Sequence, residues 1–210
     1  MSRPGMDGQT ASTLSWFRDW VSSQLGGNRH ERRVAAIARS LFELTTPMHD
    51  LNRGDLRLLK LAAYLHDVGR SEQNKNHAAI GARIIRRDRA LPLKKRQRRA
   101  LAYMALRHRG RVPDAENDPA LGRVNDPGKV RLLLGFLRAA DGLDSRGLAT
   151  PRLSISRRGQ VIRVVCRLRE DTAKARRIFT RRKKFRLLEE LLECRVEVVV
   201  VAKRRLRAVA

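Results

Sequence analysis

Five histidines are spread along this chain of 210 residues, and one of them directly precedes an aspartate at the end of an apolar segment. That pair, His66 and Asp67 in the segment LAAYLHDVGR, comes just before Gly69. Side chains of neighbouring helical residues point about 100° apart, but at a helix end both can face one point. A buried aspartate in that place needs a cation or several hydrogen-bond donors to offset its desolvation. The pair is therefore a candidate for a metal site.

A second His-Asp pair competes for the same interpretation. His49 and Asp50 lie in the segment PMHDLN, in a predicted connection between two helices. Imidazole and carboxylate are both common metal ligands, so residue type alone does not choose between the pairs. The side chains that could supply the rest of such a site are His30, His77, His108 and Asp141.

Hydrophobic residues at helical spacing predict the elements that must position these side chains. Asn28, with Glu31 three residues later, resembles a capping box. Asp55 is the expected cap of the following helix, and Asp126 before Pro127 is a good helix start. Residues 1–13 are expected to be disordered, and the expected helices cover 13–25, 29–45, 55–68, 76–87, 93–108 and 127–144.

The pattern changes after Pro151, where apolar and polar residues alternate on both sides of Gly159. This alternation predicts a β-hairpin. A helical period then returns, with Asp171 as the expected cap, and a β-branched segment predicts a last strand. We therefore expect a mainly α protein, a helical bundle with a small C-terminal α+β appendage in the order β-β-α-β. The expected parts are an N-terminal segment with a short amphipathic helix at 1–27, a helical domain at 28–150 and the appendage at 151–210.

The formal net charge of +26 is the dominant global feature of the chain. A strongly basic surface concentrates polyanions and speeds their capture, so nucleic acid, polyphosphate, phosphorylated nucleotides and anionic membrane surfaces all fit. Two dense basic segments, 83–99 and 169–186, carry few aromatic residues, in a chain that is only 4% aromatic. That composition argues against a stacking platform for single-stranded nucleic acid, and it is compatible with a track for the backbone of a polyanion.

The chain lacks the sequence features of a membrane or secreted protein. No apolar segment approaches the roughly 20 residues that a membrane span needs, and the N-terminal residues lack the apolar centre of a signal peptide. We therefore expect a cytoplasmic protein. Cys166 and Cys194 match no metal-ligand spacing and are expected to be reduced core residues.

The order of the histidines and acids resembles a known signature. The HD superfamily of metal-dependent phosphohydrolases carries the series H…HD…H…H…D on an all-helical bundle. In this chain the matching series is His30, His66-Asp67, His77, His108 and Asp141. The resemblance implies an HD-domain helical bundle that binds one or two divalent ions.

The resemblance also implies which residues bind each ion. One ion would be held by His30, His66, Asp67 and Asp141, and a second by His77 and His108, with Asp67 bridging the two. Imidazole and carboxylate ligands without thiolate suit Mn, Fe, Mg, Ni or Zn, and the sequence does not choose among them.

Longer segments make the resemblance more specific. LFELTTPMHDLNRGDLRLLKLAAYLHDVGRS and LLLGFLRAADGLDSR look like the C-terminal HD-like domain of the Ppx/GppA exopolyphosphatase and guanosine-pentaphosphatase family, and the likeness covers roughly residues 28–203. There PMHDLN aligns with a family segment of the form LHGL, in which no acid follows the histidine. The resemblance therefore implies that His49 belongs to a helix connection, that Asp50 is solvated, and that His66 and Asp67 form the site.

Two features depart from that family. Its actin-like, glycine-rich phosphatase half has no counterpart here, since nothing in residues 1–27 could replace it. The family often has a pair of histidines where this chain has His77 alone, followed by an IGA-type helix as in general HD hydrolases. The absence of the phosphatase half leaves open whether the site catalyses a reaction or only binds a ligand.

Phosphoryl chemistry at such a site needs further cations near the phosphoryl oxygens, and the planar guanidinium of arginine fits these oxygens bidentately. Arg70, just after the HD pair, is the preferred candidate and would join His66 and Asp67 in the catalytic set. The other substrate-binding candidates are Lys75, Arg107 and Arg109, for which a solvated surface position is the favoured interpretation. Asp144, three residues after Asp141, is expected to be a cap or salt-bridge partner rather than a ligand.

We therefore expect a stand-alone HD phosphohydrolase that acts on a phosphoanhydride-rich anion, either polyphosphate or a guanosine polyphosphate. One alternative is a non-catalytic polyphosphate-binding or regulatory module that works beside a separate phosphatase subunit. A weaker alternative is an RNA-binding accessory protein. The complete ligand series favours the enzyme, and the missing catalytic half favours the binding module.

Overall fold

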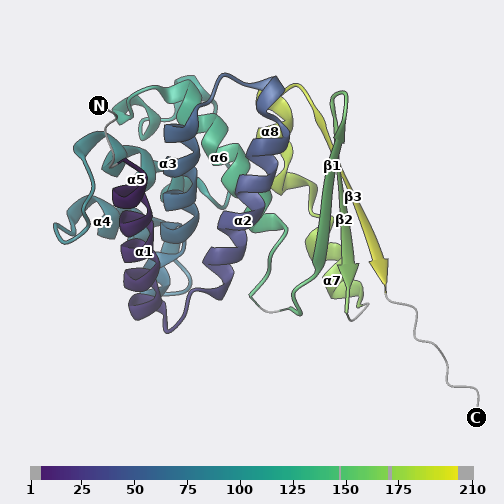
Figure 1. The fold of residues 1–210 in the computed structure, drawn as a ribbon, viewed down its shortest axis with the longest axis horizontal. Helices are drawn as coiled ribbons and strands as arrows, with labels where there is room; N and C mark the ends of the chain where they lie inside the picture. The colour runs from purple at the N-terminus through teal and green to yellow at the C-terminus, as the bar shows by residue number, and fades with distance from the viewer. Residues whose placement is uncertain (1–5, 147, 170–171, 203–210) are drawn as a thin grey trace, which may run out of the picture.

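The computed structural model describes residues 6–146, 148–169 and 172–202 (Figure 1). Long helices form one side of the molecule, and a small sheet lies at the other side. The long helices are α1 (Met6–Leu25), α2 (Arg29–Leu44), α3 (Arg53–Leu65), α4 (His77–Arg87), α5 (Lys95–Arg107) and α6 (Pro127–Gly142). The predicted mainly α fold with a small C-terminal α+β part is confirmed.

Helix α6 forms the centre of the core because it is apolar on several sides. Leu134, Phe136 and Leu137 are fully buried, and α2, α3 and α5 all contact this helix. Asp126 begins α6 as predicted, since its side chain accepts a hydrogen bond from a backbone amide of the first turn and Pro127 follows it. The position of α6 matters for function because its C-terminal end carries Asp141.

Two predicted helix caps differ in the structure. Asn28 makes no cap hydrogen bond for α2, and its amide instead donates to a backbone carbonyl of α1 (2.9 Å). Glu31 is fully buried and forms an ion pair with Arg146. At α3 the N-cap residue is Asn52 rather than Asp55. Asp55 occupies the third helical position, where its side chain accepts a hydrogen bond from the Asn52 amide and completes a capping box.

Two element boundaries also differ from the prediction. Helix α1 begins at Met6, so residues 6–13, which were expected to be disordered, are helical. Residues 1–5 lie outside the described part of the chain. Helix α3 ends at Leu65, and His66 and Asp67 form a turn that leads into the short 3₁₀ helix η2 (Val68–Ser71).

The described residues form one sheet with the strand order β1 (Arg152–Arg158), β2 (Val161–Leu168), β3 (Arg195–Ala202). β1 and β2 form the predicted antiparallel hairpin, and β3 pairs with β2 in parallel. Alternate residues of β2 are buried, so one face of this strand packs into the core. Cys166 lies on that face, and burial raises the pKa of its thiol to about 12. Cys194 is half-buried, and both cysteines are free.

The single helix predicted after the hairpin is interrupted. The chain forms α7 (Ala173–Phe179), the 3₁₀ turn η5 (Arg182–Lys184) and α8 (Arg186–Leu191) before it enters β3. Thr172 caps α7 by accepting a hydrogen bond from the Ala175 amide. The predicted cap, Asp171, lies outside the described residues. A parallel strand pair needs a crossover connection of this kind.

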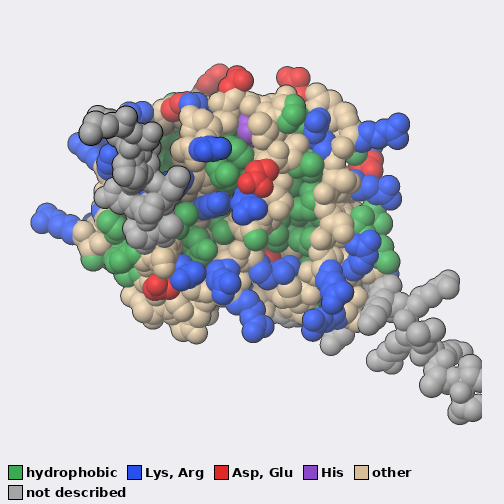
Figure 2. All heavy atoms as spheres, in the orientation of Figure 1, with side chains coloured by type: hydrophobic (Ala, Val, Ile, Leu, Met, Phe, Trp, Pro, Cys, Tyr) green, Lys and Arg blue, Asp and Glu red, His purple; other side chains and the backbone are tan. Residues whose placement is uncertain are grey.

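The molecular surface is strongly basic, as the composition requires. Figure 2 shows Lys and Arg side chains spread over one face and gathered along its lower edge, with few acidic side chains among them. None of the helices in the described part of the chain is long and apolar enough to cross a membrane.

Gly69 allows η2 to cross directly against the first turns of α4. A Cβ atom at this position would lie 2.1 Å from the carbonyl oxygen of His77 and 2.5 Å from the amide nitrogen of Gly81. Both neighbours are backbone atoms, which cannot rotate away. The crossing therefore sets the distance between Asp67, just before η2, and His77, the first residue of α4.

Gly69→Ala should lower the free energy of unfolding by about 3 kcal/mol, because overpacking against backbone forces the elements apart. Denaturant unfolding measures this loss. Gly122→Ala is the matched control, since nothing lies within 4 Å of a Cβ atom at that position, and it should stay within about 0.5 kcal/mol of wild type. Equal stabilities of the two variants would contradict the close crossing.

Candidate metal centre

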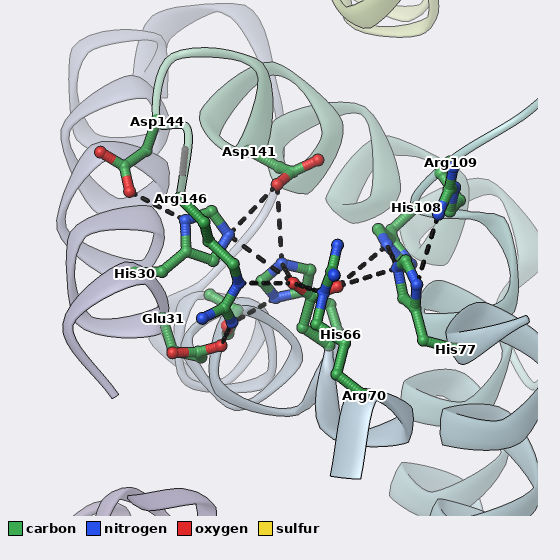
Figure 3. A network of polar contacts seen from close by, with 12 residues as sticks. His30, Glu31, His66, Arg70, His77, His108, Arg109, Asp141, Asp144 and Arg146 are labelled. Carbon is green, nitrogen blue, oxygen red and sulfur yellow. Dashed lines mark hydrogen bonds and ion pairs between the residues drawn. The ribbon is translucent and has the colours of Figure 1, made fainter. Parts of the chain in front are cut away.

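The six predicted metal-ligand side chains come together because all of them lie at helix ends (Figure 3). They are His30 in the first turn of α2, His66 and Asp67 after α3, His77 at the start of α4, His108 after α5 and Asp141 in the last turn of α6. Five helices thus direct ligand-type side chains into one region. The order of these residues along the chain had predicted the same set.

In the described part of the chain, the ligand atoms form two groups. His30, His66 and Asp141 make one group, and Asp67, His77 and His108 make the other. Within each group the atoms lie within 4.8 Å of one another. Two atoms that bind the same ion at about 2.1 Å each are about 3.0 to 4.2 Å apart. The contacts of Asp141 with His30 and His66, at 3.4 and 3.6 Å, fall in this range.

Asp67 lies between the two groups and turns one carboxylate oxygen toward each. Oδ1 is 3.1 Å from His77 Nε2 and 3.4 Å from His108 Nε2. Oδ2 is 3.8 Å from His66 Nε2 and 4.0 Å from His30 Nε2. The carboxylate is therefore placed where a bridging ligand would stand, as the family resemblance implies.

One buried nitrogen tests whether these residues fit an ion. His66 Nε2 is buried and has no hydrogen-bond partner among the described residues. Asp141 Oδ1 lies 3.6 Å and Asp67 Oδ2 3.8 Å from it, which is too far for a hydrogen bond. A buried polar atom left without a partner costs free energy, whereas a cation among these three atoms would satisfy all of them. The residues therefore fit a divalent metal ion.

Hydrogen bonds from the other ring nitrogen orient the histidines. His66, His77 and His108 bond through Nδ1 to backbone carbonyls three residues earlier, at 2.8, 2.6 and 2.7 Å. A ring nitrogen that donates to a carbonyl carries the proton, so Nε2 of the neutral ring offers its lone pair to the site. The local chain geometry at each helix end thus selects the metal-binding tautomer.

His30 is oriented by a carboxylate instead of a carbonyl. Its Nδ1 donates to Asp144 Oδ2 (2.8 Å), and Arg33 Nε donates to Asp144 Oδ1 (2.8 Å). Asp144 is therefore an ion-pair partner, as predicted. Burial lowers the pKa of His30, but hydrogen bonds with Asp141 and Asp144 outweigh it and raise the pKa to about 9.

The protonation states of Asp67, Asp141 and His108 suit metal binding, whereas His66 differs: burial lowers its pKa, but the nearby Asp67 and Asp141 outweigh burial and raise it. Burial would raise the pKa of Asp67, but the surrounding histidines hold it well below its usual range. The pKa of Asp141 is likewise low, because Lys184 and the nearby histidines outweigh its burial. Burial lowers the pKa of His108 to about 4. Both carboxylates are therefore ionised and His108 is neutral near pH 7, which are the states that metal ligands need.

Cationic side chains contact the two carboxylates from outside the ligand groups. Arg70 Nε lies 2.7 Å and Arg146 Nε 3.1 Å from Asp67 Oδ2 (Figure 3). Lys184 forms an ion pair with Asp141. These contacts offset the negative charge of the carboxylates and leave cationic groups beside the ligand cluster.

Sequence reasoning missed three of the residues in this network. Glu31 is fully buried and pairs with Arg146, while Lys184 comes from the C-terminal appendage. Arg146 follows Asp141 by five residues, so closeness to a ligand was an available signal. For Lys184 the sequence offers no local signal, because its contact arises only when η5 packs against α6.

The second His-Asp pair lies away from this site. The His49 ring packs against Phe42 and Phe136, with centroids 4.7 and 5.6 Å apart. Its Nε2 donates to the Phe42 carbonyl (3.2 Å), and its Nδ1 accepts from the Leu51 amide (3.2 Å). Backbone groups therefore occupy both ring nitrogens, and Asp50 is exposed. His49 has a packing role in a helix connection.

A cleft of about 390 Å³ opens over the ligand groups. Arg70 and Arg109, two of the predicted substrate-binding residues, line it. Lys75 is exposed and does not line it. Arg107 does not line it either, because its guanidinium forms a bidentate ion pair with the buried Asp118 (3.0 and 2.7 Å). The substrate-binding predictions for Lys75 and Arg107 are corrected accordingly.

We predict that the purified protein binds up to two divalent transition-metal ions. Asp67→Ala should lose most of the metal, because both groups lose a carboxylate oxygen, whereas His108→Ala should lose only one ion. Elemental analysis of gel-filtered protein measures the stoichiometry. His49→Ala is the matched control and should keep the wild-type content. Full metal in folded Asp67→Ala, or a wild type that binds no offered Mn, Fe, Ni or Zn, would contradict the site.

Comparison with known proteins agrees with the geometry of the site. The model of the HD domain matches residues 28–170, which is more than half of the chain and includes all six candidate ligands. No match was found among curated proteins. HD domains are typically metal-dependent hydrolases, and their histidines and aspartates bind divalent ions. The chain belongs to the HD domain family.

Proposed function

We propose that this protein is a metal-dependent phosphohydrolase whose substrate is a phosphoanhydride-rich anion, such as polyphosphate or a guanosine polyphosphate. The observation that carries the proposal is the cleft itself. Its floor holds two compact His-Asp groups, with Asp67 of one group facing the histidines of the other, and its remaining polar lining is mostly cationic. The cations are Arg70, Arg109, Arg146, Arg181, Lys183 and Lys184.

A metal ion held by these groups would polarise a phosphoryl oxygen and supply hydroxide from bound water near neutral pH. The ligand set combines imidazole and carboxylate without thiolate, which suits Mn, Fe, Mg, Ni or Zn. His30, His66 and Asp141 would hold one ion, and His77 and His108 a second, with Asp67 shared.

The arginines beside the ligands suit the second requirement of phosphoryl chemistry, which is to balance the charge that develops on the phosphoryl oxygens. Arg70 uses Nε for Asp67 and one terminal nitrogen for Asn74. Arg146 is held by the buried Glu31 as well as by Asp67. Both guanidiniums are thus fixed in direction, so little rotamer entropy is lost when a phosphate arrives.

The lining of the cleft favours phosphate groups over nucleobases. Among the described residues that line it, none is Phe, Tyr or Trp, so no aromatic platform for a stacked base lies next to the ligands. A guanosine polyphosphate would therefore be recognised chiefly through its phosphates. This feature supports a substrate class defined by its phosphoanhydrides.

One rival proposal is a non-catalytic module that binds polyphosphate beside a separate Ppx/GppA-type phosphatase. The longer likeness to the C-terminal domain of that family supports it, but orientation of all four histidines through Nδ1 favours a working metal site. Of the two basic segments, as far as the structure describes them, 169–186 lines the cleft and 83–99 does not, so no single polyanion track runs through both, which weakens the RNA-binding alternative. Arg98 of segment 83–99 donates to three backbone carbonyls.

A phosphate-release assay on Mn²⁺-loaded protein tests the proposal. Tripolyphosphate, long-chain polyphosphate and guanosine pentaphosphate are offered separately, with single-stranded RNA as the nucleic-acid control. We expect release from at least one phosphoanhydride and a loss of more than about 100-fold in Asp67→Ala, since even changes around metal ligands cost 10- to 100-fold. His49→Ala should stay near wild type.

The other outcomes separate the alternatives. Tight, metal-dependent binding of polyphosphate without any release would favour the binding module. Tighter binding of RNA than of polyphosphate, unchanged when the metal is removed, would favour the nucleic-acid alternative. Release that persists unchanged in folded Asp67→Ala would overturn the proposed site.

A further inference from the structure

The C-terminal appendage reaches into the cleft over the metal-ligand groups. Ile178, Arg181, Lys183 and Lys184, from α7 and the segment around η5, line it together with the ligands. All four residues lie beyond residue 170, where the match to the HD domain ends. The appendage therefore adds cations to a site whose ligands all come from the helical bundle.

Lys184 is the most firmly held of these cations. Its ammonium forms an ion pair with Asp141 Oδ2 and lies 3.4 Å from the His108 carbonyl oxygen. The side chain is 15% exposed, whereas Arg181 and Lys183 are exposed to solvent. The ammonium also stands where the C-terminal ends of α5 and α6 meet, and the negative ends of helix dipoles favour a cation there.

Two glycines on one face of α6 allow this close approach. Gly135 and Gly142 are seven residues apart, so they lie on the same side of the helix. A Cβ atom at Gly142 would lie 2.8 Å from Lys184 Cβ, and one at Gly135 would lie 3.2 Å from the backbone of Leu188. α8 and η5 both contact α6 (Figure 1). The packing therefore fixes where Lys184 enters the cleft.

The carboxylate of Asp141 faces two ways. Oδ1 lies 3.4 Å from His30 Nε2 and 3.6 Å from His66 Nε2, while Oδ2 meets Lys184. A lysine ammonium has three donors. The ammonium can therefore stay paired with the Asp141 carboxylate and still donate hydrogen bonds to a second anion in the cleft.

We infer that Lys184 is a substrate-binding residue, supplied by the C-terminal appendage, whose ammonium contacts a phosphoryl oxygen beside the metal-ligand groups. This inference rests on the proposed phosphohydrolase function, and it adds a residue outside the matched HD domain. Arg181 and Lys183 raise the local concentration of a polyanion but, being exposed, hold no fixed geometry. Lys184 alone among these three is anchored to a ligand-bearing helix end.

The test measures binding separately from turnover. Wild type, Lys184→Met, Lys184→Arg and Lys184→Gln are loaded with Mn²⁺, and calorimetry measures first the Mn²⁺ affinity and then the affinity for a methylene-bridged analogue of tripolyphosphate, which is not cleaved. Arg186→Met is the matched control, because it removes one exposed positive charge from the same appendage at a position that does not line the cleft.

We expect Lys184→Met to bind the analogue about tenfold more weakly, the size of one charge-assisted hydrogen bond, with a matching rise in KM for tripolyphosphate. Lys184→Arg should stay within about threefold of wild type, since it keeps the charge. The Mn²⁺ affinity of Lys184→Met should not fall, because the variant removes a positive charge next to the ion. Arg186→Met should match wild type throughout.

Each contrary result points to a different failure. If wild type binds neither Mn²⁺ nor the analogue, the proposed function fails and this inference falls with it. If wild type binds both and Lys184→Met binds the analogue as tightly as Arg186→Met does, the inference alone is overturned. It is also overturned if Lys184→Met loses Mn²⁺ together with the analogue, since Lys184 then serves only to position Asp141. Circular dichroism checks the fold, and Lys184→Gln replaces Lys184→Met if that variant is unfolded.

Discussion

Asp67 is a carboxylate that is only 3% exposed, and the rest of the site is arranged to offset its burial. Removing an ionised carboxylate from water costs several kcal/mol even in a relaxed protein interior. Here His77 and His108 approach one oxygen, and Arg70 and Arg146 donate to the other. His77 and His108 lie at the ends of α4 and α5, so the packing that brings these helix ends together also supplies partners to this carboxylate. Offsetting the charge of one buried carboxylate thus requires side chains from several helices of the bundle.

The sequence predicted the six side chains that the structure brings together, but not the network around them. His30, His66, Asp67, His77, His108 and Asp141 could be found because their order and their places at helix ends are visible in one dimension. The predicted capping box at the start of α2 was wrong because its side chains have partners that are far away along the chain or in another helix. The Asn28 amide reaches a carbonyl of the preceding helix, and the Glu31 carboxylate is taken by Arg146, 115 residues further along the chain. Local rules cannot anticipate a partner that only tertiary packing supplies.

The interrupted helix of the appendage shows the same limit. The helical period of 171–193 continues without proline or glycine, so nothing in the pattern predicts the break at η5. The structure breaks it so that Phe179 and Phe185 are both buried and η5 contacts α6. Packing two aromatic side chains and seating Lys184 against Gly142 favour the break over a continuous helix. Tertiary burial here overrides local propensity.

The basic composition is partly structural. Arg98 clamps three backbone carbonyls between α4 and α5, and Arg138 donates to the carbonyls of Arg107 and Gly110. Arg131 likewise donates to the Pro113 carbonyl (2.9 Å). A guanidinium group has several donors, so it can bond to backbone carbonyls at helix ends and in loops that have no partner within a helix. The total charge therefore overstates the surface that is free to meet a polyanion, and the cations that line the cleft are the better guide to function.

Within the cleft, three of the six cations form ion pairs with the two ligand-type carboxylates. Arg70 and Arg146 pair with Asp67, and Lys184 pairs with Asp141. A divalent ion bound by these carboxylates would supply the positive charge that the three cations provide, and would leave their donors available to an anion. Binding of the ion and binding of a phosphate would then favour each other, because each ligand offsets the charge that the other leaves unbalanced. Under the proposed function, the opposed charges of the cleft would thus suit a metal ion and a phosphate group bound together better than either bound alone.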